Sequence, residues 1–553
     1  MRRLLTSLLV VLVTIVILIG AGVGFFLYRK YAPSKEWTDQ AVWYGVSGDE
    51  TAILWNQEQV ESVTGRKIGG QAYLPLVWVQ DTLNERFYWD EKNHQLLYTL
   101  PDAIVAADAS TMGSNGSPLF VEQEDQVWLQ TSLVSTYTNV QVQTFLDSDV
   151  KRIFVDSGRD HLQSAILKKS GMVRVRGGVK SDILCEAAAD SYVEVLEPLE
   201  KWTRVRTEDG YIGYIQNKLL GEQQEQPVVN SFEEPVYTNI SMEEPVCLVW
   251  HQVTSQQANQ TMPQLMAKTK GVNVIAPTWL MLTDNEGTFE SFASQAYVDQ
   301  AHAMGLQVWA VLDNFNKGDN VQSEVLFAST EARRRLIAGL LQEAKTYQLD
   351  GINLDIEGIK PAAGPHYIQF IRELSIGCRQ AGIVLSVDSY VPASYNAFYN
   401  WAEQGRVTDY VVIMGYDEHY AGGEAGSVAS LGYERRGIEE TLRMVPKEKI
   451  ISAIPFYTRL WKEEGDKTTS KAMGIASAKR WVEENKVELY WQEELGQYYG
   501  ELTQGAEKYS IWMEEEKSIQ KKVDLIREHD LAGVACWKLG FETENIWELL
   551  KLQ

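Results

Sequence analysis

The 553-residue sequence contains few of the residues that build metal centres and disulfide frameworks. Its seven histidines show no HxH or HxxxH spacing, and its four cysteines form no CxxC pair: Cys185, Cys247, Cys378 and Cys536. Zinc sites and disulfide scaffolds are marked by such close spacings. We therefore predict no metal, no cofactor and four isolated, buried thiols.

Basic residues are also scarce. The chain has 51 Lys and Arg against 75 Asp and Glu, and its formal net charge is −24. Nucleic acid and anionic lipid are bound by basic faces, so neither is expected as a partner of the folded part. The hydrophobic content of 45% is that of a globular protein, and the length predicts about two to four domains.

One long hydrophobic run stands at the N-terminus. It is uncharged over residues 4–28 and is flanked by Arg2 and Arg3 before it and by Arg29 and Lys30 after it. A membrane-spanning helix needs about 20 apolar residues, whereas a cleaved signal peptide has a shorter apolar core and an A-x-A-like exit site. We therefore predict a transmembrane anchor at 4–28, with a cleaved leader as the alternative. Basic residues at both ends leave its orientation open.

Two small β-rich modules are predicted next, because short β-branched and aromatic runs alternate with turn signals. Residues 40–150 resemble the module at the N-terminus of copper amine oxidases, without copper ligands, and are interpreted as a stalk. Residues 168–222, with "MVRVRGG", "SYVEVLEPLEKWTRVRT" and "GYIGYIQNKLL", resemble a bacterial SH3 domain. That resemblance implies binding of cell-wall peptides, and a spacer is the alternative. The acidic, proline-punctuated residues 223–244 are predicted to be a linker.

Eight apolar runs alternate with helical segments over residues 245–553. They begin at Val246, Val272, Leu306, Leu349, Ile383, Asp409, Ile450 and Leu531. Near-continuous apolar strands alternating with helices indicate a parallel sheet covered on both faces. Eight units predict an α/β fold, a (β/α)8 TIM barrel. A doubly wound open sheet is the alternative, but it would normally carry a glycine-rich phosphate loop after its first strand, and none is seen.

Two further elements of the barrel are expected. The helix before the fourth strand has an apolar stripe that includes Leu336 and Leu340, and Arg333 is placed on its opposite, polar face. The long connection between the seventh and eighth strands contains a helix, "SAKRWVEENK", and a hairpin, "YYGELTQGAEKYSIWMEE". This insertion is predicted to wall one side of the groove above the barrel.

The fourth strand ends in "DGINLDIE" and carries polar residues at alternate positions. Asn353, Asp355 and Glu357 share one face, whereas Ile352, Leu354 and Ile356 share the other. Catalytic groups of a TIM barrel lie at this end of its strands. Two adjacent carboxylates are costly to bury, and their repulsion raises the proton affinity of one, as a general acid requires. An internal hydrogen-bond cluster without catalysis is the alternative.

These residues resemble the D-x-x-D-x-D-x-E signature of family 18 glycoside hydrolases, with Asp350, Asn353, Asp355 and Glu357 in its four places. The resemblance covers the whole final domain. Asn353 replaces the second aspartate, so it can hydrogen-bond Asp355 but cannot titrate. The "DGxNxDxE" form is similar to that of spore-cortex and cell-wall N-acetylglucosaminidases in the family.

The resemblance implies a mechanism in which the substrate supplies the nucleophile. Glu357 would protonate the glycosidic oxygen while the N-acetyl carbonyl attacks the anomeric carbon. Asp355 would orient the acetamide N–H and stabilise the oxazolinium-like charge, and Glu357 would then activate water. No separate carboxylate nucleophile is needed, and none is expected from the sequence.

The sixth strand ends in "MGYD", which matches the family's M-x-Y-D motif. The resemblance implies that Tyr416 bonds the acetamide oxygen, that Asp417 bonds a sugar hydroxyl, and that Met414 lies beside them. Trp537, near the end of the eighth strand, matches the aromatic floor beneath the scissile sugar, with core packing as its alternative. Further aromatic residues near strand ends are expected either in sugar subsites or in the core: Trp279, Trp309, Tyr390, Tyr457 and Trp461.

Together these features imply a membrane-anchored glycosidase that cleaves N-acetylglucosamine linkages in peptidoglycan. A cell-wall substrate would place the bulk of the chain outside a cell membrane that it crosses once. A chitinase-like enzyme acting on chitin oligomers is one alternative, and a non-catalytic protein that binds cell-wall carbohydrate is another. Non-catalytic relatives usually lack the final glutamate, so the presence of Glu357 favours catalysis.

Overall fold

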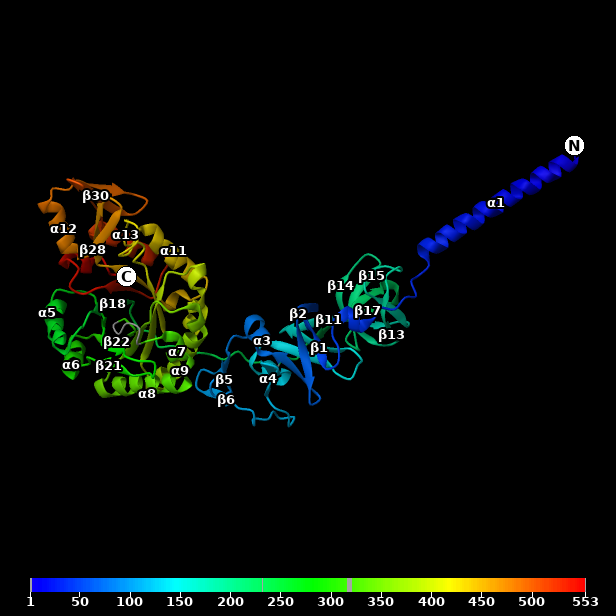
Figure 1. Ribbon diagram of the computed structural model, residues 1–553, viewed down its shortest axis with the longest axis horizontal. Coiled ribbons are helices and arrows are strands. Elements are labelled where there is room, and N and C mark those ends of the chain that lie inside the picture. The colour runs from blue at the N-terminus through cyan, green and yellow to red at the C-terminus, as the bar shows by residue number, and fades with distance from the viewer. Residues whose placement is uncertain (1, 231, 316–320, 553) are drawn as a thin grey trace. The chain divides into compact units, whose positions relative to one another are not determined.

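The computed structural model of the chain describes residues 2–230, 232–315 and 321–552, with side chains from residue 7 onward. The chain forms two compact units (Figure 1). The first comprises residues 1–87, 94–96 and 106–234, and the second comprises residues 88–93, 97–105 and 235–553.

The N-terminal hydrophobic run is helical. Helix α1 (Arg2–Tyr31) is long and apolar enough from Ser7 onward to cross a membrane, and its apolar stretch is not buried in the protein. A signal sequence meets the same criteria of length and composition. The structure therefore shows an apolar N-terminal helix, and its use as an anchor stays a prediction.

The first unit contains two seven-stranded, mostly antiparallel sheets. The first has the order β7-β8-β3-β2-β1-β10-β9, and the second β13-β12-β16-β15-β14-β11-β17. Strands of the first are β1 (Glu50–Trp55), β2 (Glu58–Ile68), β3 (Gln71–Pro75), β7 (Phe120–Gln123), β8 (Gln126–Gln130), β9 (Val140–Phe145) and β10 (Lys151–Ser157). Strands of the second are β11 (His161–Leu167), β12 (Gly171–Arg174), β13 (Ile183–Ala187), β14 (Tyr192–Pro198), β15 (Trp202–Thr207), β16 (Ile212–Gln216) and β17 (Leu220–Pro227). Helices α2 (Gln40–Tyr44), α3 (Leu76–Thr82) and α4 (Thr131–Tyr137) complete the unit.

The strand pair expected within the SH3-like segment is present. Strands β14 and β15 are antiparallel, with Val195 opposite Val205, and both side chains are buried in the core of this sheet. All four cysteines are free thiols, but Cys185, on the edge strand β13, is partly exposed, so the prediction of four buried thiols is wrong there. The boundaries 40–150 and 168–222, and the two resemblances attached to them, remain predictions.

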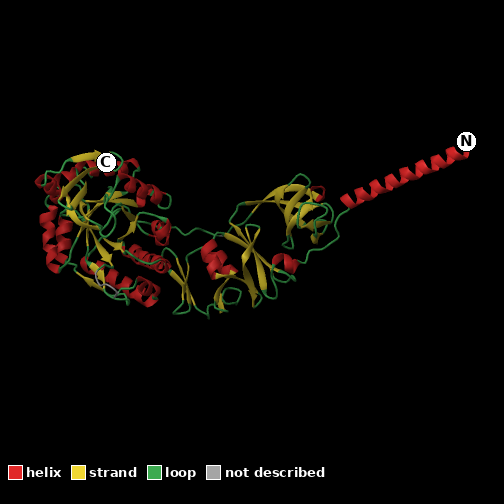
Figure 2. Cartoon of the chain, turned by 45° about the horizontal axis from the view of Figure 1, so that its top comes forward, coloured by secondary structure: helices red, strands yellow, loops and turns green. Residues whose placement is uncertain are grey.

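The predicted TIM barrel is confirmed in the second unit. Eight parallel strands form a closed ring, because β19 pairs with both β18 and β22 and β32 pairs with both β26 and β18. The ring is surrounded by helices (Figure 2). Its strands are β18 (Val246–His251), β19 (Val274–Pro277), β22 (Gln307–Asp313), β23 (Gly351–Asp355), β24 (Val384–Tyr390), β25 (Tyr410–Met414), β26 (Ile450–Pro455) and β32 (Gly533–Trp537). The main helices are α5 (Met262–Met266), α6 (Gln295–Ala303), α7 (Ser323–Ala328), α8 (Thr330–Tyr347), α9 (Gly364–Ala381), α10 (Trp401–Val407), α11 (Leu431–Leu442) and α13 (Glu516–Glu528).

Alternation along the strands creates two hydrophobic cores. On β23, Ile352 and Leu354 pack outward in the large core shared with the helices. The inner core contains side chains such as Trp250, Val311 and Val412. Successive residues of one strand therefore face the surrounding helices and the barrel interior alternately. This alternation directs the polar residues of β23 into the barrel.

Helix α8 differs from its prediction at one residue. Its apolar stripe is confirmed, since Leu336 and Leu340 are buried, but Arg333 is also fully buried. The guanidinium of Arg333 donates to both carboxylate oxygens of Glu373 on α9, each at 3.0 Å. A bidentate carboxylate partner allows burial of a charge that the helical pattern alone places in solvent.

A short segment from before residue 106 belongs to the barrel unit. Strands β4 (Phe87–Asp90), β5 (Gln95–Thr99) and β6 (Ile104–Ala107) form a three-stranded sheet. Arg333 donates to the Tyr88 hydroxyl at 3.2 Å, and Thr330 donates to Asp90 at 2.5 Å. This part of the barrel unit, residues 88–93 and 97–105, therefore completes the polar surroundings of α8.

The insertion between the seventh and eighth barrel strands contains the expected helix and hairpin. Helix α12 (Ile475–Glu484) lies against a five-stranded sheet with the order β28-β27-β31-β30-β29. Its strands are β27 (Tyr457–Glu464), β28 (Lys467–Gly474), β29 (Leu489–Gln492), β30 (Gln497–Gln504) and β31 (Glu507–Met513). A smaller pair, β20 (Leu280–Leu282) and β21 (Phe289–Ser291), follows β19.

Candidate active site

Glu357 lies two residues beyond β23, at the carboxyl end of the barrel. The Tyr390 hydroxyl at the end of β24 donates to Glu357 Oε2 at 2.7 Å. Burial raises the pKa of Glu357, the hydrogen bond from Tyr390 opposes that rise, and the nearby Asp417 charge adds to it. The net rise keeps a larger fraction of this carboxyl protonated near neutral pH.

The backbone of Glu357 is held from the neighbouring strand. Asn314 Nδ2 donates to the Glu357 carbonyl at 2.8 Å, and the Glu357 amide donates to Asn314 Oδ1 at 3.0 Å. The reciprocal pair fixes the peptide from which the Glu357 side chain projects. Asn314 directly follows β22, so two adjacent strand ends position one carboxyl.

Three aspartates lie side by side on three consecutive strands. Asp313 on β22 pairs in register with Asp355 on β23. Leu354 pairs with Val387, so Asp388 on β24 is the next neighbour of Asp355. Burial raises the pKa of Asp355 well above its usual range, and the carboxylates of Asp388 and Glu357 raise it further. A side-chain hydrogen bond also joins Asp355 to Glu357.

Asn353 has a different partner from the one expected. Its Nδ2 donates to Asp388 Oδ1 at 2.7 Å and to Ser386 Oγ at 2.9 Å, and its Oδ1 accepts from Trp250 Nε1 at 3.0 Å. These three bonds use both N–H donors of the amide and one lone pair of its oxygen, and none goes to Asp355. The predicted bond from Asn353 to Asp355 is therefore replaced by a bond to the next strand.

The residues of the sixth strand lie on the same rim. Met414 is buried at the end of β25, Tyr416 is half-buried just beyond it, and the Asp417 side chain is about half exposed. The Tyr457 hydroxyl donates to Asp417 Oδ1 at 2.5 Å, and the Arg459 guanidinium lies 4.0 Å from the same oxygen. Burial raises the pKa of Tyr416 well above its usual range, and the nearby Asp355 carboxylate adds to the rise. Tyr416 is therefore a neutral hydrogen-bond donor at all ordinary pH values.

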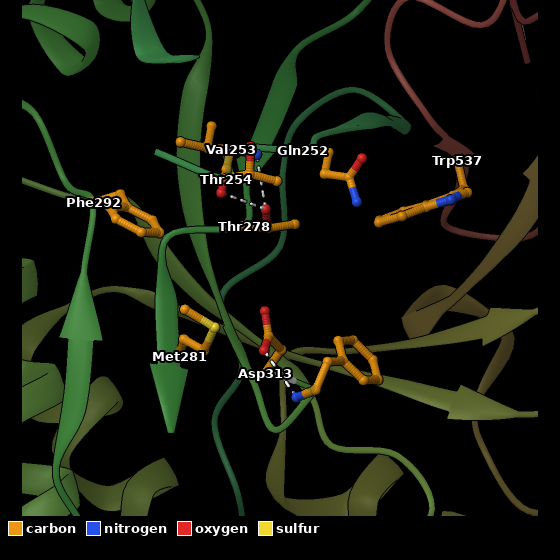
Figure 3. A pocket seen from close by; sticks show the side chains of 9 residues that line it. Gln252, Val253, Thr254, Thr278, Met281, Phe292, Asp313 and Trp537 are labelled. Carbon is orange, nitrogen blue, oxygen red and sulfur yellow. Dashed lines mark hydrogen bonds between the residues drawn. The ribbon is translucent and has the colours of Figure 1, made fainter. Parts of the chain in front are cut away.

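A cleft of about 410 Å³ has Asp313 in its lining (Figure 3). Trp537 forms one side of it and packs on Trp250, with ring centroids 5.9 Å apart. Asp313 points toward its open centre, and burial raises the pKa of Asp313 to about 6. The remaining lining residues are Gln252, Val253, Thr254, Thr278, Met281, Phe292 and Phe315. The cleft combines apolar and aromatic walls with a few polar groups, as small-molecule and sugar sites do.

Other predicted residues lie elsewhere. Asp350 precedes β23 at its opposite end, where its carboxylate accepts from His302 Nε2 and from the Val308 amide, each at 2.8 Å. The structure therefore does not bring Asp350 together with Glu357. Three of the aromatic residues proposed for subsites or core are fully buried and belong to the core: Trp279, Trp309 and Trp461.

Three residues of this site were missed by sequence reasoning: Asp313, Asn314 and Asp388. Asp313 and Asp388 stand near the carboxyl ends of the third and fifth strands, where the rule applied to the fourth strand also predicts function. Asp313 is a further carboxyl that lines the cleft, and the expectation that no separate carboxylate nucleophile takes part stays a prediction. Among the residues that the structure describes, no group of three or more His, Cys, Asp or Glu side chains is arranged to hold a metal ion.

A closed barrel with carboxyls and an aromatic wall at the carboxyl ends of its strands defines a TIM-barrel glycosidase. Comparison with protein families makes this specific. Residues 318–542 match the family Glycosyl hydrolases family 18. The chain carries a glycoside hydrolase domain of this family.

Curated relatives match this part of the chain. The uncharacterized glycosylase YvbX of Bacillus subtilis is 27% identical over 259 residues, covering 44% of this chain and 74% of that protein. The cortical fragment-lytic enzyme of the same species is 27% identical over 238 residues, covering 41% of this chain. The match spans 55% of that enzyme's length.

Solved structures share the fold. The Bacillus cereus spore cortex-lytic enzyme SleL aligns with a TM-score of 0.51 and 20% identity, over 60% of this chain and 77% of that one. A chitinase from Chromobacterium violaceum aligns with a TM-score of 0.50 and 18% identity, over 56% of this chain and 98% of that one. At these identities the likeness shows the barrel fold.

Proposed function

We propose that the protein is a membrane-anchored, extracellular glycosidase that cleaves N-acetylglucosamine linkages in peptidoglycan with retention of configuration. The observation that carries the proposal is the state of Glu357. Its carboxyl lies at the mouth of the barrel, its pKa is raised by burial, and Tyr390 donates to one of its oxygens. A carboxyl in these surroundings is suited to give up a proton and take one back near neutral pH.

The other residues of the rim support substrate-assisted chemistry. Glu357 donates its proton to the glycosidic oxygen as the acetamide carbonyl oxygen bonds to the anomeric carbon and the leaving alcohol departs. Asp355 Oδ1 is a buried oxygen with no hydrogen-bond partner among the described residues, and the proposal assigns it the acetamide N–H of the bound sugar. Tyr416 is a neutral phenol suited to bond the acetamide oxygen, and Trp537 offers a face to the sugar ring. Water then opens the oxazolinium ring while Glu357 takes a proton from it.

Four predicted substrate-binding residues take supporting places in this proposal. Asp417 is oriented by Tyr457 toward a sugar hydroxyl, and Met414 packs beneath the rim. Asn353 is fully buried and acts through Asp388, not on the substrate. Asp350 is kept as a residue that fixes the start of β23.

Peptidoglycan is favoured as the substrate by the segments before the barrel. An apolar N-terminal helix suits an anchor, and the SH3-like and stalk-like segments suit a protein that works at a wall. Two of the curated relatives are named for lysis of cortical fragments and for glycosylase activity. Chitin oligomers, and binding of cell-wall carbohydrate without cleavage, are the competing outcomes of the test.

The first experiment uses a soluble form of the chain that begins at Ser34. It is incubated with purified peptidoglycan and, separately, with chitin oligomers, and the products are identified by mass spectrometry. We expect new reducing-end N-acetylglucosamine from peptidoglycan, and we expect Glu357→Gln to reduce the rate by at least about a hundredfold. Cleavage of chitin alone would indicate a chitinase. Binding without cleavage by both the wild type and Glu357→Gln would indicate a lectin-like barrel.

Asp313→Asn provides the matched control for the mechanism. It also removes a carboxyl that faces the cleft, but the proposal gives that carboxyl no covalent role. We therefore expect Asp313→Asn to retain most of the turnover, and the first-formed product to have the anomeric configuration of the substrate by NMR. If Asp313→Asn loses turnover and the wild type forms a glycosyl adduct on Asp313, the nucleophile is Asp313 and not the acetamide.

A further inference from the structure

Asp388 lies one strand away from Asp355 but cannot touch a substrate, since its side chain is only 2% exposed. Leu354 on β23 is paired in register with Val387 on β24. Asp355 directly follows Leu354, and Asp388 directly follows Val387. Side chains that are neighbours in a parallel sheet point to the same face. The two carboxyls are therefore adjacent inside the barrel.

The two carboxyls are unequally provided with donors. Asp388 Oδ1 accepts from Asn353 Nδ2 at 2.7 Å, and the Trp250 indole N–H also bonds Asp388. Asp355 Oδ1 has no partner among the described residues, and the hydrogen bond of Asp355 goes to another carboxyl, that of Glu357. Donors stabilise the carboxylate form, so charge is favoured on Asp388 and a proton on Asp355.

Further acidic groups surround the pair, and no basic side chain among the described residues is paired with it. The titratable groups that face the pair are Asp313 from β22, Glu357 from the end of β23, Tyr416 from the end of β25, Tyr367 from α9 and Tyr399 from the segment before α10. Within the described parts of the chain, no salt bridge joins Asp388 to a basic side chain. Two adjacent buried carboxyls without a cation cannot both carry charge at modest cost. One proton therefore stays with the pair.

We propose that Asp388 is a positioning residue whose charge, fixed by Asn353, holds that proton on Asp355 and so presents an O–H to Glu357. This inference rests on the proposed function of Glu357. When Glu357 gives its proton to the glycosidic oxygen, the Asp355 O–H is already directed at the carboxylate left behind. When Glu357 takes a proton from water, the Asp355 O–H is retained, so the pair gains and loses no proton over the cycle.

An exchange of groups tests the proposal. Asp388→Asn removes the charge, and the double variant Asn353→Asp with Asp388→Asn puts the carboxyl and the amide in each other's places. Ser389→Ala is the matched control, because Ser389 lies on the same strand, is equally buried and donates to Gln404 at 2.8 Å. All are made in the soluble form that begins at Ser34.

For Asp388→Asn we expect kcat to fall by about ten- to a hundredfold with KM changed less than about twofold, since the residue acts through Asp355. The alkaline limb of the kcat profile should move to lower pH, because Asp355 ionises more easily without the adjacent charge. The double variant should recover most of the lost kcat, and Ser389→Ala should keep the wild-type profile. An unchanged profile in Asp388→Asn, or no recovery in the double variant, overturns the proposal.

A second readout needs no substrate. The folded pair keeps a proton that the unfolded chain loses, so wild-type melting temperature should fall as pH rises from about 5 to 8, and Asp388→Asn should fall less steeply. If the wild type cleaves nothing, the proposed function fails and this comparison still decides the role of Asp388. If the wild type cleaves but the two melting profiles are parallel, the function stands and the pairing of Asp388 with Asp355 fails.

Discussion

At the scale of single residues, the Tyr390 hydroxyl is the contact whose effect on Glu357 can be isolated most directly. It donates to Glu357 Oε2 at 2.7 Å, and this bond strengthens as Glu357 becomes a carboxylate in the transition state. A hydrogen bond to a charged group is worth about 1.5–3 kcal/mol. We therefore expect Tyr390→Phe to lower kcat by about ten- to a hundredfold.

The pH dependence gives that prediction its sign. The Tyr390 bond lowers the pKa of Glu357, so its removal raises that pKa, and the alkaline limb of the rate profile should move to higher pH. Tyr399→Phe is the matched control, because its hydroxyl donates to the Ile356 carbonyl and not to Glu357. A profile that is unchanged in Tyr390→Phe would show that Glu357 is not the group that titrates.

Sequence reasoning identified the direction of the site residues but not their partners. The two-residue period of a strand places Asn353, Asp355 and Glu357 on one face without any structure. The bond from Asn353 to Asp388 depends on the register between β23 and β24, which the period of one strand does not contain. For the same reason, Asp313 and Asp388 were not recognised as neighbours of Asp355.

At the scale of secondary structure, Glu434 shows how α11 is attached to the barrel. Ser452 Oγ on β26 donates to Glu434 Oε1 at 2.6 Å, and burial raises the pKa of Glu434 to about 8. The unfolded glutamate ionises near pH 4.5. The folded state therefore retains a proton that the unfolded state loses, and stability falls by about 1.4 kcal/mol per pH unit between these values.

Glu434→Gln should therefore flatten the pH dependence of stability. The amide cannot ionise, so we expect the variant to match or exceed the wild type in urea unfolding at pH 8 and to lose its advantage near pH 5. Glu439→Gln, on the exposed side of the same helix, should leave the wild-type slope intact. A wild-type slope that persists in Glu434→Gln would mean that Glu434 is charged in the fold.

Helices and strands were predicted correctly where their own apolar pattern determines which side chains are buried. The prediction failed where burial depends on a hydrogen-bond partner distant in the sequence. All eight barrel strands are apolar enough to be recognised without a structure. Arg333 was misplaced because its burial depends on Glu373 and on Tyr88, which lies far before the barrel. Periodicity within α8 contains no information about either partner.

At the scale of the whole molecule, the barrel does not end at the linker. Its compact unit includes residues 88–93 and 97–105, and a form that begins at Pro235 would lack them. We expect that form to melt at a lower temperature than the form that begins at Ser34, because Arg333 and Thr330 lose their partners Tyr88 and Asp90. Buried groups left without partners cost about 1–3 kcal/mol each.

Tyr88→Phe, in the form that begins at Ser34, separates this contact from the effects of truncation. It removes the hydroxyl that bonds both Arg333 and His366 and keeps the ring. We expect about 1–3 kcal/mol of lost stability in urea unfolding, with turnover at ambient temperature retained. The segment would add nothing to the barrel if the forms that begin at Ser34 and at Pro235 melted at the same temperature and Tyr88→Phe lost no stability.

Closure of the ring by β32 also has a consequence for how the protein is made. The first barrel strand, β18, takes β32 as one of its two neighbours, and β32 is the last of the eight barrel strands to be synthesised. Until the ribosome has released it, β18 presents an unpaired edge, and a nascent chain with such an edge is prone to aggregate. The barrel ring therefore closes only after its eighth strand, β32, has left the ribosome.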